Sequence, residues 1–313
     1  NGLLDLNKLV FTGDGNSLVN FTGNNYIVNE LRVKKNIPTV EVEFTISGPK
    51  YKVKGLTIER GNLKTFSSEL EISGNADFSG EGEVIADKII FAGGEDSQIT
   101  PGEQRHENVA VDKEPGYGIE ITPNGKKYKI KAFTLERGQV TAPGSEFDFS
   151  GNTDLSGGTF SADKITFSGS EGAAFIPGAD VYTYVIVEKS AGVEVILLEQ
   201  LLVNHLKLIQ GNLNAQGKNI TANQDVDLSG GTLHNPGNLL LGGDQPSALK
   251  TGNNPLDNLV VDKETNVEVE TLDPLTCNHL DIMGGIFQPG NNTTFNNSVN
   301  VTGGTLVLEG TPE

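Results

Sequence analysis

The chain has 313 residues, a formal net charge of −18, 39 glycines and no tryptophan. It lacks the clustered Lys and Arg that nucleic acid or an anionic membrane surface requires, so we expect neither partner. A single cysteine, Cys277, excludes an internal disulfide framework, and no apolar run approaches the roughly 20 residues of a membrane span.

The chain begins with "NGLLDLNKLVF", which lacks the basic and then apolar pattern of a signal peptide. This stretch also starts inside a strand-like alternation of residues. We interpret the chain as a mature product or as a fragment of a longer protein.

Short runs of alternating apolar and polar residues predict strands with one buried face. In "LTIERGNL", Leu56 and Ile58 alternate with polar residues before Gly61 turns the chain. The segments "ELEISG" and "EFDFSG" repeat this alternation. A helical period comes closest in "VILLEQLLVNHLKL" (195–208), which we also assign to strands because its counterparts elsewhere in the chain are strand-like.

Three sequence markers recur in constant order and predict an internal repeat. The first marker reads "GLTIERGNL", "AFTLERGQV", "HLKLIQGNL" and "HLDIMGGIF", and its glycine recurs at a nearly constant spacing as Gly61, Gly138, Gly211 and Gly285. The second marker reads "LRVKK", "VAVDK", "VIVEK" and "LVVDK", and the third reads "DFSGEGEV", "DLSGGTF", "DLSGGTL" and "NVTGGTL". The predicted units are the partial copy 1–54, the full copies 55–131, 132–204 and 205–278, and the partial copy 279–313.

Two all-β architectures could contain such units. Tandem β-sandwich modules would each need about 100 residues and a closed core of their own. Units of about 75 residues with short strands fit better to a parallel β-helix, in which each coil buries its apolar face on its neighbours. We therefore predict a single β-solenoid over residues 1–313, with coils of roughly 25 residues and about three coils in each repeat.

The repeat also resembles a known kind of protein. The segments "ITFSGSEGAAFIPG", "YVIVEKSAGVEVIL" and "LLVNHLKLIQGNLNAQGKNITANQDVDLSGGTL" are similar to repeats of very large bacterial cell-surface proteins, the adhesin-like proteins of the Bacteroidetes type. The resemblance extends from Leu9 to Leu308. It implies a secreted β-helical protein that serves as an adhesin or surface layer, and it supplies no catalytic residues.

Glycine-rich turns carry the candidate metal ligands. Asp14, Glu95, Asp96 and Asp244 lie in "FTGDGN", "FAGGED" and "LLGGDQ", where carbonyl and carboxylate oxygens can converge on calcium. Their spacing matches neither an EF-hand nor a nonapeptide calcium repeat. Solvated turn carboxylates are the alternative, and no other cofactor is expected.

Two aromatic residues are the candidates for a carbohydrate platform. Tyr182 and Tyr184 in "VYTYVIV" are two residues apart, so a regular strand would direct both rings to one side. Packing against a neighbouring loop explains the same pattern.

The remaining candidates for chemistry favour structural roles. His205 and His279 occupy the same slot of the repeat, which is unusual for a catalytic group, and Cys277 aligns with apolar inward positions. Arg60 and Arg137 also share a slot. Because pectate-lyase-like enzymes combine a β-helix with basic residues and acidic calcium ligands, a polysaccharide lyase or hydrolase stays an alternative.

The sequence thus predicts a non-enzymatic extracellular protein with a structural or adhesive role. We expect a segment of a surface stalk, surface layer or filament that self-associates through the solenoid ends. Its partners would be copies of itself or flanking segments of a longer parent chain. The alternative function is a carbohydrate-binding adhesin that uses the lateral face of the solenoid.

Overall fold

The computed structural model describes residues 4–21, 26–46 and 50–308, and these residues form 32 strands and no helix. Within them, no helix is long and apolar enough to cross a membrane. The chain divides into two compact units, Asn1–Phe149 with Asp154–Asp163 and Ser150–Thr153 with Lys164–Glu313. The expectation of one solenoid domain over 1–313 therefore stays a prediction.

The strands are short and follow one another through turns. The first unit contains β1 (Leu4–Leu6), β2 (Leu9–Gly13), β3 (Ser17–Phe21), β4 (Tyr26–Lys35), β5 (Glu41–Ile46), β6 (Lys50–Arg60), β7 (Asn62–Ile72), β8 (Ala76–Asp77), β9 (Val84–Gly93), β10 (Ser97–Thr100), β11 (Arg105–Lys113), β12 (Gly118–Ile121), β13 (Tyr128–Arg137) and β14 (Gln139–Phe149). Residues of both units occur in β15 (Thr153–Asp154) and β16 (Thr159–Gly169).

The second unit continues the same alternation of strand and turn. It contains β17 (Ala173–Ile176), β18 (Val181–Lys189), β19 (Glu194–Leu197), β20 (Leu201–Gln210), β21 (Asn212–Asn214), β22 (Ile220–Ala222), β23 (Val226–Asp227), β24 (Thr232–His234), β25 (Leu239–Gly243), β26 (Ser247–Lys250), β27 (Leu256–Lys263), β28 (Glu268–Thr271), β29 (Thr276–Gly284), β30 (Ile286–Gln288), β31 (Thr294–Val301) and β32 (Thr305–Leu306). The ambiguous segment 195–208 forms strands, as predicted.

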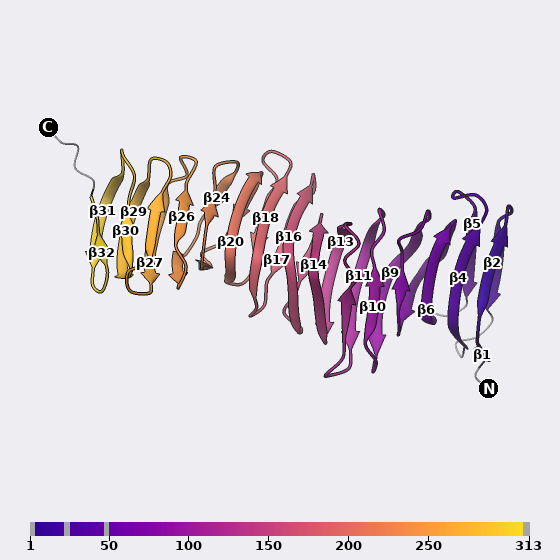
Figure 1. Cartoon of the computed structure of the whole chain (residues 1–313). Helices are drawn as coiled ribbons and strands as arrows, with labels where there is room; N and C mark the ends of the chain where they lie inside the picture. Colours follow the sequence, from indigo (N-terminus) through magenta and orange to yellow (C-terminus); the bar gives the residue numbers. More distant parts are fainter. Residues whose placement is uncertain (1–3, 22–25, 47–49, 309–313) are drawn as a thin grey trace. The chain divides into compact units, whose positions relative to one another are not determined.

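Strands on successive turns stack in parallel within each unit (Figure 1). In the second unit, Leu201 on β20 pairs with Ile220 on β22, which pairs with Leu239 on β25. Leu239 pairs with Leu259 on β27, and Leu259 pairs with Leu280 on β29. All five side chains are fully buried. This ladder confirms the predicted all-β parallel solenoid, and its turns are shorter than the predicted coils, at about 20 residues each.

The turns do not divide the repeat evenly. From Leu206, three pairing steps lead through Val226 and Leu249 to Thr271. The residue that matches Leu206 in the next repeat is Leu280, which lies beyond Thr271 in the chain and belongs to the other ladder. One repeat therefore spans three turns and part of a fourth, and the prediction of three coils in each repeat is not confirmed.

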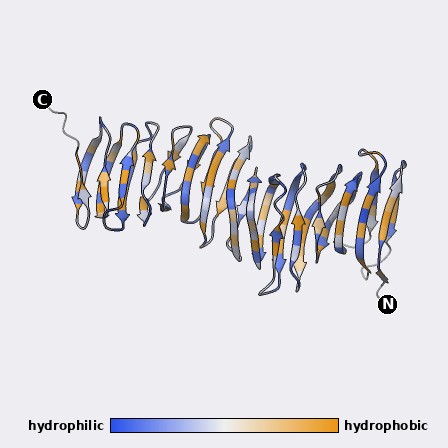
Figure 2. Cartoon of the chain, in the orientation of Figure 1, coloured by the Kyte–Doolittle hydropathy of each residue, from blue (hydrophilic) through white to orange (hydrophobic). Residues whose placement is uncertain are grey.

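Long strands bend at a corner of the solenoid, and the bend interrupts their alternation. On β20 the inward residues Leu201 and Val203 are two positions apart, and so are Leu206 and Leu208. Val203 and Leu206 are three apart, because the corner lies between them. Figure 2 shows the hydrophobic and hydrophilic residues that alternate along the straight parts of the strands.

The core of the first unit is closed by aromatic rings. Phe133, Phe147, Phe149 and Phe160 are buried, and the ring centroids of Phe147 and Phe160 lie 4.9 Å apart. Such ring pairs contribute about 0.5–1.5 kcal/mol each beyond the burial of their surface. Narrow turns can thus form a dense interior without tryptophan.

The third marker forms a tight turn in the copies where it reads Asp-x-Ser-Gly. In the second copy, Asp154 accepts hydrogen bonds from the backbone N of Ser156, at 3.0 Å, and from its Oγ, at 2.7 Å. Asp77 with Ser79 and Asp227 with Ser229 make the same pair of bonds. The glycine that follows is required because a Cβ on Gly157 would lie 2.0 Å from the carbonyl O of Leu135.

Candidate functional site

Four lysines that end the second marker are buried inside the solenoid. They are Lys35, Lys113, Lys189 and Lys263, and none is more than 3% exposed. The glycine of the first marker packs against each of them. For example, Gly138 has a φ of 100°, and a Cβ at this position would lie 2.7 Å from the Cβ of Lys113. The two markers recur together because they make one contact.

Oxygen atoms of the preceding turns surround each buried ammonium group. Lys113 Nζ donates to the carbonyl oxygens of Ser73 (2.7 Å), Ala92 (2.9 Å) and Glu95 (2.9 Å), and to Ser97 Oγ (2.7 Å). Burial of an ammonium group is tolerated only where such hydrogen bonds replace water. The lysine therefore ties successive turns together.

The other copies repeat this arrangement. Lys35 Nζ donates to the carbonyl oxygens of Thr12 and Gly15 and to Ser17 Oγ. Lys263 Nζ donates to the carbonyl oxygens of Asn223, Gly242 and Gln245, and Lys189 Nζ to those of Ser150 and Ser168.

Burial changes the pKa of two of these lysines. It lowers the pKa of Lys113 to about 8, although Glu95 and Asp96 oppose the change. Burial also lowers the pKa of Lys263 to about 8, against the influence of Asp225 and Asp244. Both ammonium groups thus remain largely protonated at neutral pH.

The carboxylates predicted as calcium ligands, those of Asp14, Glu95, Asp96 and Asp244, belong to the turns whose carbonyl oxygens bind these ammonium groups. Glu95 Oε2 pairs with Lys54 Nζ at 3.2 Å, and Asp96 Oδ1 accepts from the backbone N of Gly118 at 2.9 Å. Asp14 Oδ1 accepts from the amide Nδ2 of Asn36 at 2.5 Å. Among the described residues, no three His, Cys, Asp or Glu side chains are placed to hold a metal ion. The carbonyl oxygens of these turns converge on buried lysines, and calcium binding by the carboxylates stays a prediction.

The structure separates the two tyrosines that were expected to share a face. Tyr182 is buried and its hydroxyl donates to the carbonyl O of Pro177, whereas Tyr184 is 40% exposed. The corner of β18 follows Tyr182, because the next inward residue is Val185, three positions further on. Tyr184 alone can therefore present a ring to a ligand.

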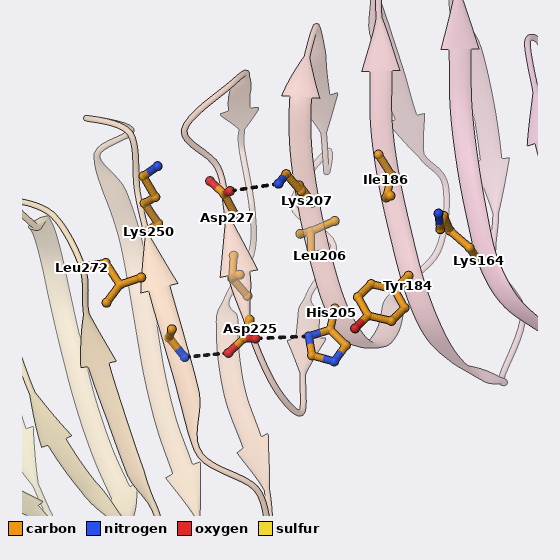
Figure 3. Close-up of a pocket in the computed structure, with 12 residues that line it drawn as sticks. Lys164, Tyr184, Ile186, His205, Leu206, Lys207, Asp225, Asp227, Lys250 and Leu272 are labelled. Atoms are coloured by element: carbon orange, nitrogen blue, oxygen red, sulfur yellow. Dashed lines mark hydrogen bonds and ion pairs between the residues drawn. The ribbon is translucent and has the colours of Figure 1, made fainter.

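Tyr184 lies beside a groove on the lateral face of the second unit (Figure 3). Its ring stacks on the imidazole of His205, with centroids 4.3 Å apart and planes 8° from parallel. His205 Nδ1 lies 3.4 Å from Asp225 Oδ2, and Asp225 Oδ1 accepts from the backbone N of Ala248 at 2.9 Å. These contacts hold the pair of rings in place.

The groove has a volume of about 530 Å³ and combines an apolar floor with charged sides. Its lining consists of Lys164, Tyr184, Ile186, His205, Leu206, Lys207, Asp225, Val226, Asp227, Ala248, Lys250 and Leu272. Lys207 Nζ lies 3.6 Å from Asp227 Oδ2. Hydrogen bonds from Ser229 help to keep the pKa of Asp227 below its usual range, although burial opposes them. The groove can therefore offer both positive charge and hydrogen-bond acceptors.

The repeated arginines and the second repeated histidine make local contacts. Arg60 pairs with Glu81 at 2.7 Å, and Arg137 pairs with Asp112 at 2.8 Å. His279 Nδ1 lies 2.8 Å from Ser298 Oγ. Each partner lies on a neighbouring turn, so these contacts join adjacent turns of the solenoid. They do not bring these residues together into a group of catalytic side chains, so they add no support to the enzymatic alternative.

Another histidine lies in the core of the first unit. His106 is 2% exposed and lies between the rings of Phe78 (4.8 Å) and Tyr128 (5.7 Å). Its Nδ1 has no hydrogen-bond partner. Burial lowers the pKa of His106 to about 4. The side chain is thus neutral at pH 7.

Cys277 is fully buried, which confirms the prediction of an inward apolar position, and burial raises the pKa of its thiol. Because the thiolate is the reactive form, we expect no reaction of native protein with a thiol reagent such as DTNB. Complete reaction should follow unfolding in guanidinium. Rapid stoichiometric labelling of the folded protein would contradict this assignment.

The sequence contains a signal for the buried lysines, although none of them is among the predicted site residues. The last residue of the second marker is Lys in all four copies, although surface positions of the repeat vary freely. The groove had a weaker signal, since its lining comes from six separate turns.

No family model, curated protein or solved structure matches the chain.

Proposed function

We propose that this protein is a non-enzymatic structural or adhesive protein of the cell surface that self-associates through the edges of its solenoid. Its resemblance to adhesin-like repeats supports an extracellular location, and its single buried cysteine is compatible with one. The stacked turns support a role as a spacer, stalk or filament subunit.

One observation carries the proposal of self-association. The inward ladder that runs from Leu239 through Leu259 and Leu280 continues to Val299 on β31. The first three side chains are fully buried, but Val299 is 41% exposed. Val301 continues the neighbouring ladder beyond Ile282 and is 46% exposed. Within the described residues, no following turn covers Val299 and Val301, although both continue ladders of buried side chains.

The first unit has a comparable edge. Leu9 and Phe11 on β2 pair with the buried residues Leu31 and Val33 of β4, yet both remain partly exposed. Within the described residues, β2 pairs only with β4, and β31 only with β29. A second copy of the chain can continue the parallel stack at such an edge, since strand edges with free N–H and C=O groups pair readily.

We expect Val299→Lys to weaken self-association by at least about tenfold, because it places a charge in the apolar joint. The matched control is Val181→Lys, which alters a side chain that is 53% exposed on β18. Size-exclusion chromatography with light scattering and negative-stain electron microscopy, each with calcium and with a chelator, measure the effect. A wild-type protein that stays monomeric at high concentration would refute axial association.

A second candidate function is carbohydrate binding by the lateral face. The groove beside Tyr184 favours it, because an exposed aromatic ring held in a fixed orientation suits the flat face of a sugar. The two functions are compatible, since an adhesive stalk needs both a joint and a ligand-binding surface. Binding of polysaccharides to the isolated protein tests this candidate directly.

A further inference from the structure

We propose that the groove beside Tyr184 binds an acidic polysaccharide, with a sugar ring stacked on Tyr184 and its carboxylates bound by Lys207 and Lys250. The proposal rests on the second candidate function and names the class of its ligand. Three features carry it: the distribution of lysines, the fixed aromatic pair and the spacing between charged side chains on successive turns.

Positive charge in the second unit is concentrated at this groove. Residues 164–313 contain six lysines and no arginine, against seventeen Asp and Glu. Lys189 and Lys263 are buried in their cages of carbonyl groups. Of the four remaining lysines, Lys164, Lys207 and Lys250 line the groove, and only Lys218 lies elsewhere. The lining also contains Asp225 and Asp227, so the groove has three lysines against two carboxylates, in a unit that is otherwise strongly acidic.

The aromatic pair provides the sugar platform. Tyr184 is backed by His205, whose imidazole is in turn held by Asp225. A ring that is already ordered loses little conformational entropy when a ligand stacks on it. Figure 3 shows Tyr184 and His205 in one row of the groove and Lys207, Asp227 and Lys250 in the row beside it.

The charged row follows the direction of stacking. Ile186 pairs with Lys207 on the next turn, Lys207 with Asp227, and Asp227 with Lys250. Parallel strands lie about 4.8 Å apart, so Lys207 and Lys250 are separated by about two such steps. A single step is close to the length of one sugar unit, so an extended chain along the groove would place every second acidic group near one of the two lysines. Asp225 and Asp227 between them can accept hydrogen bonds from sugar hydroxyls.

The test compares polygalacturonate with a neutral galactan as probes for the full chain, by isothermal titration calorimetry. We expect polygalacturonate to bind more tightly, with an affinity that falls as salt is added. Tyr184→Ala and the double variant Lys207→Gln with Lys250→Gln should each weaken binding by about tenfold or more. The matched controls are Tyr117→Ala, at 39% exposure, and Lys218→Gln, and both should leave affinity within about twofold.

Each other result overturns a defined part of the proposal. Equal binding of the neutral galactan would preserve carbohydrate binding and refute the choice of an acidic ligand. Tight binding that the two groove variants do not change would refute the location. Binding of polyglutamate at the same affinity would show a site for acidic chains in general, and absence of binding to all three probes would refute both the inference and the second candidate function.

Discussion

Replacement of Lys113 with Met is expected to lower the free energy of unfolding by about 3–5 kcal/mol. The ammonium group donates to four oxygen atoms from the turns around it, and Met fills a similar volume without any donor. Three carbonyl groups and the Ser97 hydroxyl would then lose a buried partner, and each unsatisfied polar group costs about 1–3 kcal/mol. Guanidinium denaturation measures the total effect, and hydrogen exchange should localise the loss of protection to β10–β12.

The control for this experiment is Lys34→Met, one residue before another buried lysine. The side chain of Lys34 is 60% exposed and pairs with Glu59 at 3.0 Å. Exposed ion pairs contribute at most about 1 kcal/mol, so this variant should change stability little. If Lys113→Met is destabilised no more than Lys34→Met, the caged lysines are not what ties the turns together.

The second large effect is expected on acidification. The pKa of His106 is about 4 in the folded chain and about 6.5 when unfolded, so the unfolded chain binds more protons between these values. Stability therefore rises with pH over this window, and it is lost as pH falls from 6.5 towards 4. At 1.36 kcal/mol for each pKa unit, His106 alone should cost about 3 kcal/mol at the acidic end.

The repeat itself supplies the matched variant. The slot of His106 is occupied by Val28, Tyr182 and Leu256 in the other copies, and all three are buried. His106→Leu should remove this part of the acid sensitivity and leave the contribution of the carboxylates unchanged. The measurement is the difference between the two proteins in melting temperature from pH 7 to pH 4. A constant difference would mean that His106 is protonated within the fold.

The corner of the strand explains why the tyrosine prediction failed in its geometry. Two residues that are two positions apart share a face only on a straight strand. The bend between Tyr182 and Tyr184 places one ring in the core and the other outside. Sequence alternation could not reveal the bend, because the corner residues are polar or small in some copies and aromatic in this one.

The glycine-rich turns contain a contact that the prediction of calcium ligands did not include. The carbonyl oxygens of Ala92 and Glu95 converge in one of these turns. Their convergence point is filled by the ammonium group of Lys113 from the following turn. The sequence does not predict this contact, because Lys113 and Glu95 are 18 residues apart in the chain. It does show that the second marker ends in lysine in all four copies.

Local sequence was sufficient for the class of fold. Period-two alternation reports which residues of a straight strand face inward, and the three recurring markers report that the turns repeat. Both patterns can be recognised in the sequence without knowledge of the fold. The buried Cys277 followed from the same alignment of copies.

Tertiary structure alone decided the register of the turns, the corners and the groove. The length of a turn is set by the pairing of its strands with the strands of the preceding turn. The sequence repeat is not a whole number of these turns. Residues that match in sequence can therefore belong to different ladders, as Leu206 and Leu280 do. The groove beside Tyr184 forms from side chains on successive turns, which are far apart along the chain, and only stacking brings them together.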